Sequence, residues 1–63
     1  MKINGDIMEL SEMSIADMLD TVGFDRKYVV VEVNEEIIPR KDYDSYMLSE
    51  SDSVEVIRFV GGG

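Results

Sequence analysis

The sequence contains no cysteine, no histidine and no tryptophan. The lack of cysteine and histidine excludes disulfides, thiolate nucleophiles, imidazole acid–base catalysis and the usual zinc sites. Any chemistry must therefore rest on carboxylates, hydroxyl groups or the chain ends. No apolar run approaches the roughly 18 residues of a membrane span, and the N-terminus lacks the pattern of a signal peptide. We therefore expect a cytoplasmic protein.

The chain is short and acidic. With 63 residues it forms one domain, near the lower size limit for a core without disulfides or metals. Its 44% hydrophobic and 32% charged residues indicate a compact fold. The net charge of −8 makes nucleic acids and membrane surfaces poor partners. That charge has two interpretations, solubility alone or steering toward a basic docking surface.

The first half of the sequence predicts a hairpin. Asn4-Gly5 favours a tight turn between two short antiparallel strands within residues 1–10. By the period of two, Met8 and Leu10 face the core, and we expect Ile7 to be half-exposed.

A helix is predicted next. Ser14 is a good N-cap with Asp17 in the first turn, Gly23 ends the helix, and Phe24 packs back on the last turn. The apolar stripe is Ile15, Met18, Leu19 and Val22, and the residues expected to face water are Asp17, Asp20 and Thr21.

The second half predicts two strands separated by a polar segment. Residues 28–34 are rich in β-branched side chains, with Val29, Val31 and Val33 on one face, and predict a central strand. Residues 35–44, with Pro39, predict a loop or a weak edge element. Residues 49–53 form a link, and residues 54–60 form the last strand. The side chains expected to pack beneath the sheet are Tyr43, Tyr46, Met47 and Leu48.

This order of elements predicts an α+β fold of the ubiquitin-like β-grasp type. Four to five strands would form a mixed sheet packed on one short helix. We expect residues 1–60 to form the domain and residues 61–63 a flexible Gly-Gly-Gly tail.

The tail is the most informative feature of the sequence. Three glycines make a thread that spans roughly 10 Å when extended and fits a narrow channel. An enzyme can adenylate the carboxylate of Gly63 with ATP, and sulfur can then convert it to a thiocarboxylate without any cysteine in this chain. The alternative is a frayed end without a function.

The last strand offers a second clue. Val54 and Val56 share one face, whereas Ile57 and Phe59 share the other, which predicts an apolar docking patch beside the tail. The alternatives are that a bulge turns Phe59 inward or that Ile57 packs under the loop. Arg58 is expected to pair with an acid across the strand or with a partner.

Three segments of the sequence, residues 33–40, 48–52 and 54–63, resemble the ThiS family of sulfur carriers. The Asn4-Gly5 turn and the helix over residues 15–19 are similar too. Two departures from the family pattern occur at Tyr43 and Ser51, where the family commonly has tryptophan and glycine. Both affect packing or a turn and leave the tail unchanged.

The resemblance implies that the chain is not an enzyme but a co-substrate. A ThiF-type E1-like enzyme would adenylate Gly63 using its own ATP, a sulfur relay would give the thiocarboxylate, and a ThiG-type thiazole synthase would receive the sulfur for thiamine. This chain would hold no permanent cofactor, no metal and no catalytic side chain. Gly61 and Gly62 would thread into the partner, and the docking residues would be Ile57, Arg58, Phe59 and Val60.

Three other functions stay open at this point. The first is a MoaD-type small subunit of molybdopterin synthase, or a carrier for another thiocarboxylate pathway. The second is an acidic interaction module that is never covalently modified. The third, an enzyme, would depend on the acids at 35–36 and 42–44 or on the serines of residues 49–53, which have no histidine as base.

Overall fold

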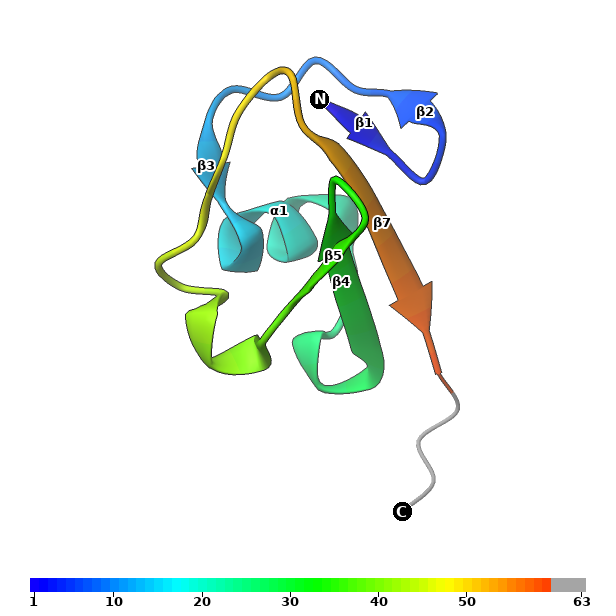
Figure 1. Cartoon of the computed structure of the whole chain (residues 1–63), viewed down its shortest axis with the longest axis vertical. Coiled ribbons are helices and arrows are strands. Elements are labelled where there is room, and N and C mark those ends of the chain that lie inside the picture. The colour runs from blue at the N-terminus through cyan, green and yellow to red at the C-terminus, as the bar shows by residue number, and fades with distance from the viewer. Residues whose placement is uncertain (60–63) are drawn as a thin grey trace.

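The computed structural model describes residues 1–59, which form a mixed sheet with one α-helix packed on one of its faces (Figure 1). The elements in chain order are β1 (Lys2–Ile3), β2 (Asp6–Ile7), β3 (Met13–Ser14), α1 (Ile15–Val22), the 3₁₀ turn η1 (Arg26–Tyr28), β4 (Val29–Val33), β5 (Glu36–Ile38), the 3₁₀ turn η2 (Arg40–Asp42), β6 (Met47–Leu48) and β7 (Ser53–Arg58). Within these residues the main sheet has five strands in the order β2-β1-β7-β4-β5, and β3 pairs with β6. The described helix is too short and too polar to cross a membrane.

The N-terminal hairpin turns at the predicted dipeptide. Asn4 and Gly5 both have positive φ angles, 51° and 86°, as a two-residue turn requires. Met8 and Leu10 follow β2 and pack half-buried against the core. Ile7 is 84% exposed, so the expectation of a half-exposed side chain is wrong. The reason is that β2 is an edge strand, and Ile7 is the ladder partner of the exposed Lys2 rather than of the buried Ile3.

The helix α1 has the predicted ends and the predicted stripe. The Ser14 hydroxyl accepts a hydrogen bond from the Asp17 backbone N–H at 3.1 Å. At the other end Gly23 is left-handed, and the N–H groups of Gly23 and Phe24 donate to the Leu19 carbonyl at 2.9 and 2.8 Å. The apolar stripe consists of the buried Ile15, Met18 and Leu19 and the half-buried Val22. The helix therefore covers the inner face of the sheet with these side chains.

The predicted alternation of β4 is confirmed. Its inward residues Val29, Val31 and Val33 are buried, whereas Val30 and Glu32 are only half-buried. β4 is an interior strand, bonded to β5 and β7, but the middle position of the sheet belongs to β7. Residues 36–38 form the short edge strand β5, which agrees with a weak edge element.

The segment between β5 and β7 packs largely as expected. Tyr43 and Leu48 are buried and Tyr46 is half-buried. Met47, however, is 60% exposed, so its predicted packing is wrong. Neighbouring residues of a strand point to opposite sides, and Leu48 takes the inward side of β6.

Candidate functional site

The strand that leads into the glycine tail is the middle strand of the sheet. β7 pairs in parallel with β1 over Ser53 and Val54, at its start, and antiparallel with β4 from Val54 to Arg58. The last ladder pair joins Val29 to Arg58, and the Phe59 N–H donates to the Tyr28 carbonyl at 3.0 Å. The end of β7 points away from the N-terminal hairpin (Figure 1). The chain is thus held in place up to the start of its last four residues.

Four predicted site residues lie beyond this point. Val60, Gly61, Gly62 and Gly63 are outside the described residues. The predicted strand over residues 54–60 is described as β7 over Ser53–Arg58, with Phe59 after it. The roles of the glycines and Val60 stay predictions.

The two faces of β7 differ as the sequence predicted. Val54 and Val56 are buried in the core, while Ile57 and Phe59 are 42% and 39% exposed. The alternatives in which Phe59 turns inward or Ile57 is covered by the loop are therefore wrong. Docking through these side chains stays a prediction.

The exposed apolar surface extends beyond β7. Val30 lies directly opposite Ile57 in the ladder and is half-buried, and Ile37 on β5 is 67% exposed. We call Val30, Ile37, Ile57 and Phe59 the open-face patch, since all four lie on strands or strand ends of the uncovered sheet face. The sequence reasoning missed Val30 and Ile37 as surface residues. The signal was the alternation of inward and outward residues in β4 and β5.

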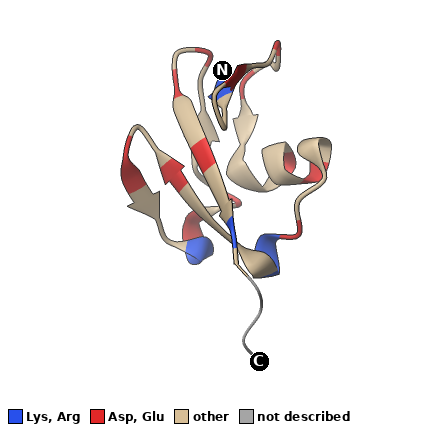
Figure 2. Cartoon of the chain, turned by 90° about the vertical axis from the view of Figure 1, so that its right-hand side faces the viewer, with Lys and Arg blue, Asp and Glu red and all other residues tan. Residues whose placement is uncertain are grey.

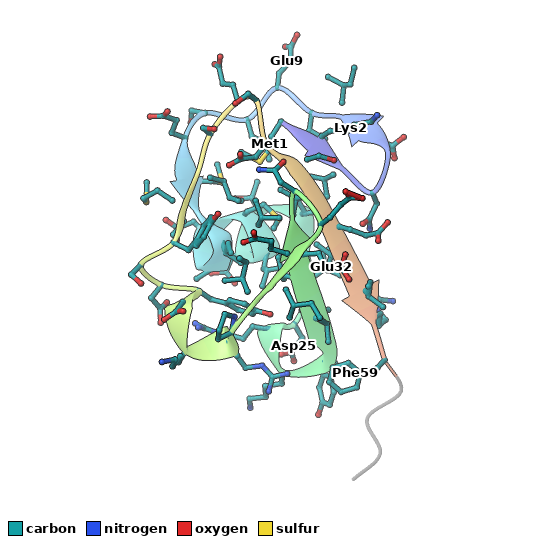
Figure 3. All side chains as sticks on the ribbon, viewed as in Figure 1. Met1, Lys2, Glu9, Asp25, Glu32 and Phe59 are labelled. Atoms are coloured by element: carbon teal, nitrogen blue, oxygen red, sulfur yellow. The ribbon has the colours of Figure 1, made fainter. Side chains whose placement is uncertain are left out.

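Two carboxylates interrupt the open-face patch. Glu32 on β4 and Glu55 on β7 are cross-strand partners (Figure 3 labels Glu32). Glu32 also pairs with Ile37 of β5 on its other side. By the ladder register, the open sheet face is acidic at Glu32 and Glu55 and apolar at the next outward pair, Val30 and Ile57. Figure 3 labels Glu32 and, at the end of β7, Phe59.

Arg58 does not form the predicted cross-strand ion pair. Its cross-strand neighbour is Val29, and its guanidinium lies 5.4 Å from the centre of the Phe24 ring. This distance allows a cation–π interaction. Within residues 1–59 the sole ion pair joins Arg26 to Asp44.

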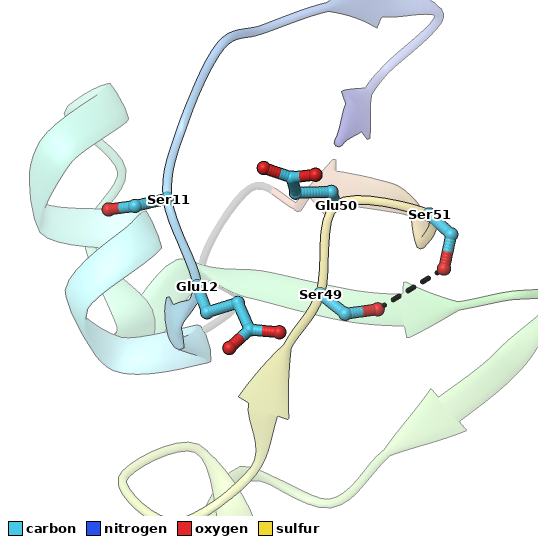
Figure 4. Close-up of a pocket in the computed structure, with 5 residues that line it drawn as sticks. All are labelled: Ser11, Glu12, Ser49, Glu50 and Ser51. Atoms are coloured by element: carbon cyan, nitrogen blue, oxygen red, sulfur yellow. Dashed lines mark hydrogen bonds between the residues drawn. The ribbon is translucent and has the colours of Figure 1, made fainter.

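The acids and serines considered for catalysis do not form a reactive arrangement in the described residues. An open pocket of about 750 Å³ is lined by Ser11, Glu12, Ser49, Glu50 and Ser51 (Figure 4). The hydroxyls of Ser49 and Ser51 are 3.3 Å apart, and no lysine or histidine is among the lining residues. Among residues 1–59, no three acids gather as a metal site would require. The acid pairs at 35–36 and 42–44 also lie apart from this pocket.

A mixed sheet that folds over one helix, and whose middle strand leads into a glycine tail, defines a ubiquitin-like β-grasp protein. The ThiS family model matches residues 1–63, and the chain belongs to the ThiS family. The predicted fold class and the family resemblance are both confirmed.

Individual relatives agree with this assignment. The sulfur carrier protein ThiS of Bacillus subtilis is 40% identical over 50 residues, which cover 79% of this chain and 76% of that protein. The crystal structure of the thiamine biosynthesis protein ThiS from Geobacter metallireducens superposes with a TM-score of 0.79 at 27% identity, covering 98% of this chain and 96% of that one.

A larger protein also contains a similar segment. A thiazole synthase of Paramagnetospirillum magneticum is 36% identical over 62 residues. The match covers 97% of this chain but only 19% of the synthase. This chain therefore spans about a fifth of that relative.

Proposed function

We propose that this chain is a sulfur carrier protein of thiamine biosynthesis that is activated at the carboxylate of Gly63. A ThiF-type E1-like enzyme adenylates the carboxylate, and a ThiG-type thiazole synthase receives the sulfur. The observation that carries the proposal is the geometry of β7. β7 is paired with β4 as far as Arg58, and the N–H of Phe59 bonds to the Tyr28 carbonyl beyond it. The exposed Ile57 and Phe59 lie beside the point where the tail begins.

The proposed chemistry uses the chain end and needs no side chain of this protein. A carboxylate oxygen of Gly63 attacks the α-phosphorus of ATP, and pyrophosphate leaves. A hydrosulfide ion from the sulfur donor then attacks the acyl carbon and displaces AMP, and loss of the S–H proton gives the thiocarboxylate. ATP belongs to the activating enzyme, so this chain requires no permanently bound cofactor.

The carrier surface follows from the same geometry. Three glycines without side chains reach roughly 10 Å into a channel of the partner. Ile57, Phe59 and Val60, together with Arg58, lie at or next to the base of that thread in the sequence and would contact the channel's entrance. Exposed apolar groups of this kind supply the burial that a specific complex needs.

The proposed sulfur acceptor is supported by the larger relative. In Paramagnetospirillum magneticum, a segment similar to this chain is part of a protein named thiazole synthase. Carrier and synthase on one polypeptide favour transfer between them, because linkage raises their effective concentration. The cytoplasm, which supplies ATP, is the proposed location.

Intact-mass spectrometry tests the function. The chain is incubated with ATP, the E1-like enzyme and a sulfur source, beside a control chain that lacks Gly63. We expect a mass gain equal to the exchange of one oxygen for sulfur in the full chain alone. An unchanged mass, with an enzyme that activates an established carrier, would contradict the proposal and favour a non-covalent interaction module.

A second step separates the thiazole pathway from the pterin pathway. The thiocarboxylated chain is offered to a thiazole synthase and, in parallel, to the large subunit of a molybdopterin synthase. We expect loss of sulfur from the carrier with the thiazole synthase alone. Transfer to the pterin enzyme would identify a MoaD-type carrier instead.

A further inference from the structure

The basic side chains are concentrated at one end of the molecule. Five of the six bases of the sequence lie in η1, in η2 or at the end of β7, and Figure 2 shows them around the point where the tail begins. We call Arg26, Lys27, Arg40, Lys41 and Arg58 the cationic rim. The sixth base, Lys2, lies on β1 at the other end (Figure 2).

The local charge differs in sign from the charge of the whole chain. Residues 25–28, 40–44 and 58, which carry the cationic rim, contain five bases and three acids (Asp25, Asp42 and Asp44), which is a net charge of +2. The rest of the chain contains one base and eleven acids, a net charge of −10, and the two parts give the total of −8. Within residues 1–59, Asp20 of α1 is the one acid outside these segments whose charge also acts on Arg26.

Contacts within the fold hold the three parts of the rim together. The Arg40 guanidinium donates to the Val29 carbonyl at 3.5 Å, and Arg58 is the cross-strand partner of Val29. Arg26 binds both carboxylate oxygens of Asp44 at 3.1 and 3.3 Å. Lys27 and Lys41 are exposed, and within residues 1–59 neither ammonium has an ion-pair partner. These two charges are therefore available to another molecule.

We propose that the cationic rim docks on an acidic surface at the mouth of the channel with which the adenylating enzyme accepts the tail. The proposal rests on the proposed carrier function and names the chemistry of its partner surface. Beyond Phe59 the chain has four residues, which reach at most about 14 Å. A partner that holds the carboxylate of Gly63 must therefore bring the surface around its channel close to the rim.

The distance over which salt screens charges determines which charges of this chain act on the partner's surface. Salt screens charges beyond roughly 8 Å at physiological ionic strength. The nearby rim therefore determines the interaction at the channel mouth more than the distant acids do. The net charge alone suggests that the chain is steered toward a basic docking surface. Such a surface would place the partner's positive charges against the positive charges of the cationic rim.

Two variants with the same net charge test the proposal. Lys27→Gln with Lys41→Gln removes two rim charges, and Lys2→Glu reverses one charge at the far end. Both change the net charge from −8 to −10. Binding to the ThiF-type enzyme without nucleotide is measured by calorimetry, and ATP–pyrophosphate exchange gives KM and kcat, each at low and high salt.

We expect the rim variant to bind about fivefold more weakly at low salt, with a raised KM and an unchanged kcat. The difference should shrink at high salt, and Lys2→Glu should behave like the wild-type chain. Equal weakening in both variants, or tighter binding of the rim variant, would overturn the docking proposal. If the wild-type chain supports ATP–pyrophosphate exchange and the rim variant has the same affinity and KM as the wild-type chain, the docking proposal is overturned but the carrier function is not. A wild-type chain that an active enzyme does not adenylate would overturn both.

Discussion

The phenol oxygen of Tyr43 accepts a hydrogen bond from the backbone N–H of Val31 at 3.2 Å, and both residues are buried. The bond joins the segment after η2 to the interior strand β4. Val31 is also the ladder partner of Ile38 in β5, so a side chain from twelve residues further along the chain reaches a backbone group inside the sheet. The side chain of Tyr43 is buried in the core, so Tyr43 acts both in packing and as a hydrogen-bond acceptor.

Tyr43→Phe should lower the free energy of unfolding by about 1 kcal/mol, because it keeps the ring but removes the buried hydrogen bond between the phenol and the Val31 N–H. Urea unfolding followed by circular dichroism measures this change. Tyr28→Phe, at a tyrosine that is 48% exposed, is the matched control and should leave the free energy of unfolding nearly unchanged. Equal effects of the two substitutions would show that the hydrogen bond to Val31 contributes nothing.

Asp52 makes the stability depend on pH. Its carboxylate accepts hydrogen bonds from the Ser49 backbone N–H at 2.9 Å and from the Asn34 amide at 3.0 Å. These bonds, the Ser49 N–H first, lower the pKa of Asp52 below its ordinary value of 3.8. A lowered pKa means that the unfolded chain binds more protons, so this contribution is present above pH 3.8 and is lost as the pH falls below it.

Asp52→Asn should therefore reduce the drop in unfolding free energy between pH 5 and pH 3. Urea unfolding at a series of pH values compares the variant with the wild-type chain. If both chains lose the same free energy of unfolding over this range, the hydrogen bonds to Asp52 are not the source of the acid sensitivity.

Features encoded by neighbouring residues were predicted correctly. The helix has a capping serine, a periodic apolar stripe and a terminal glycine within ten residues, so its position needed no tertiary information. The same holds for the alternation of β4 and for the opposite faces of Val56 and Ile57 in β7. These local signals already placed the candidate docking side chains on the surface.

Features that depend on distant segments were not predicted. Alternation puts Met47 and Leu48, and Ile37 and Ile38, on opposite sides of their strands, but which side the core covers is decided by the rest of the fold. The cationic rim is assembled from η1, η2 and β7, which are far apart in the sequence. The sequence alone showed an acidic chain, because net charge contains no information about where the charges lie.

Glu32 and Glu55 face each other across β4 and β7, and like charges in this position destabilise a sheet. Glu55→Lys should therefore raise the free energy of unfolding by about 0.5–1 kcal/mol, because it turns repulsion into attraction. Glu50→Lys changes the net charge equally at an exposed site in the link before β7 and is the control. Thermal unfolding compares the two, and an equal gain would indicate a general charge effect rather than the cross-strand pair.

The open-face patch should contribute to docking more than to stability. Ile57→Asp and Phe59→Asp, at side chains 42% and 39% exposed, should change the unfolding free energy by less than about 1 kcal/mol. Each should raise the KM of the chain in ATP–pyrophosphate exchange at least about tenfold, as expected for interface anchors. Ile7→Asp, at a more exposed isoleucine on the edge strand β2, should not change KM. An unchanged KM for the first two variants would place the docking surface elsewhere.

The length of the tail should matter more to activation than its exact composition. Deleting Gly61 keeps a terminal glycine but shortens the reach of the carboxylate by about 3.5 Å. Since misplacing a reacting group by about 1 Å can cost a hundredfold in rate, kcat/KM for adenylation should fall at least about a hundredfold. Binding without nucleotide should stay within about twofold, because the cationic rim and the open-face patch are intact. Gly61→Ala keeps the length and should lose far less; equal losses would mean that width rather than reach limits entry into the channel.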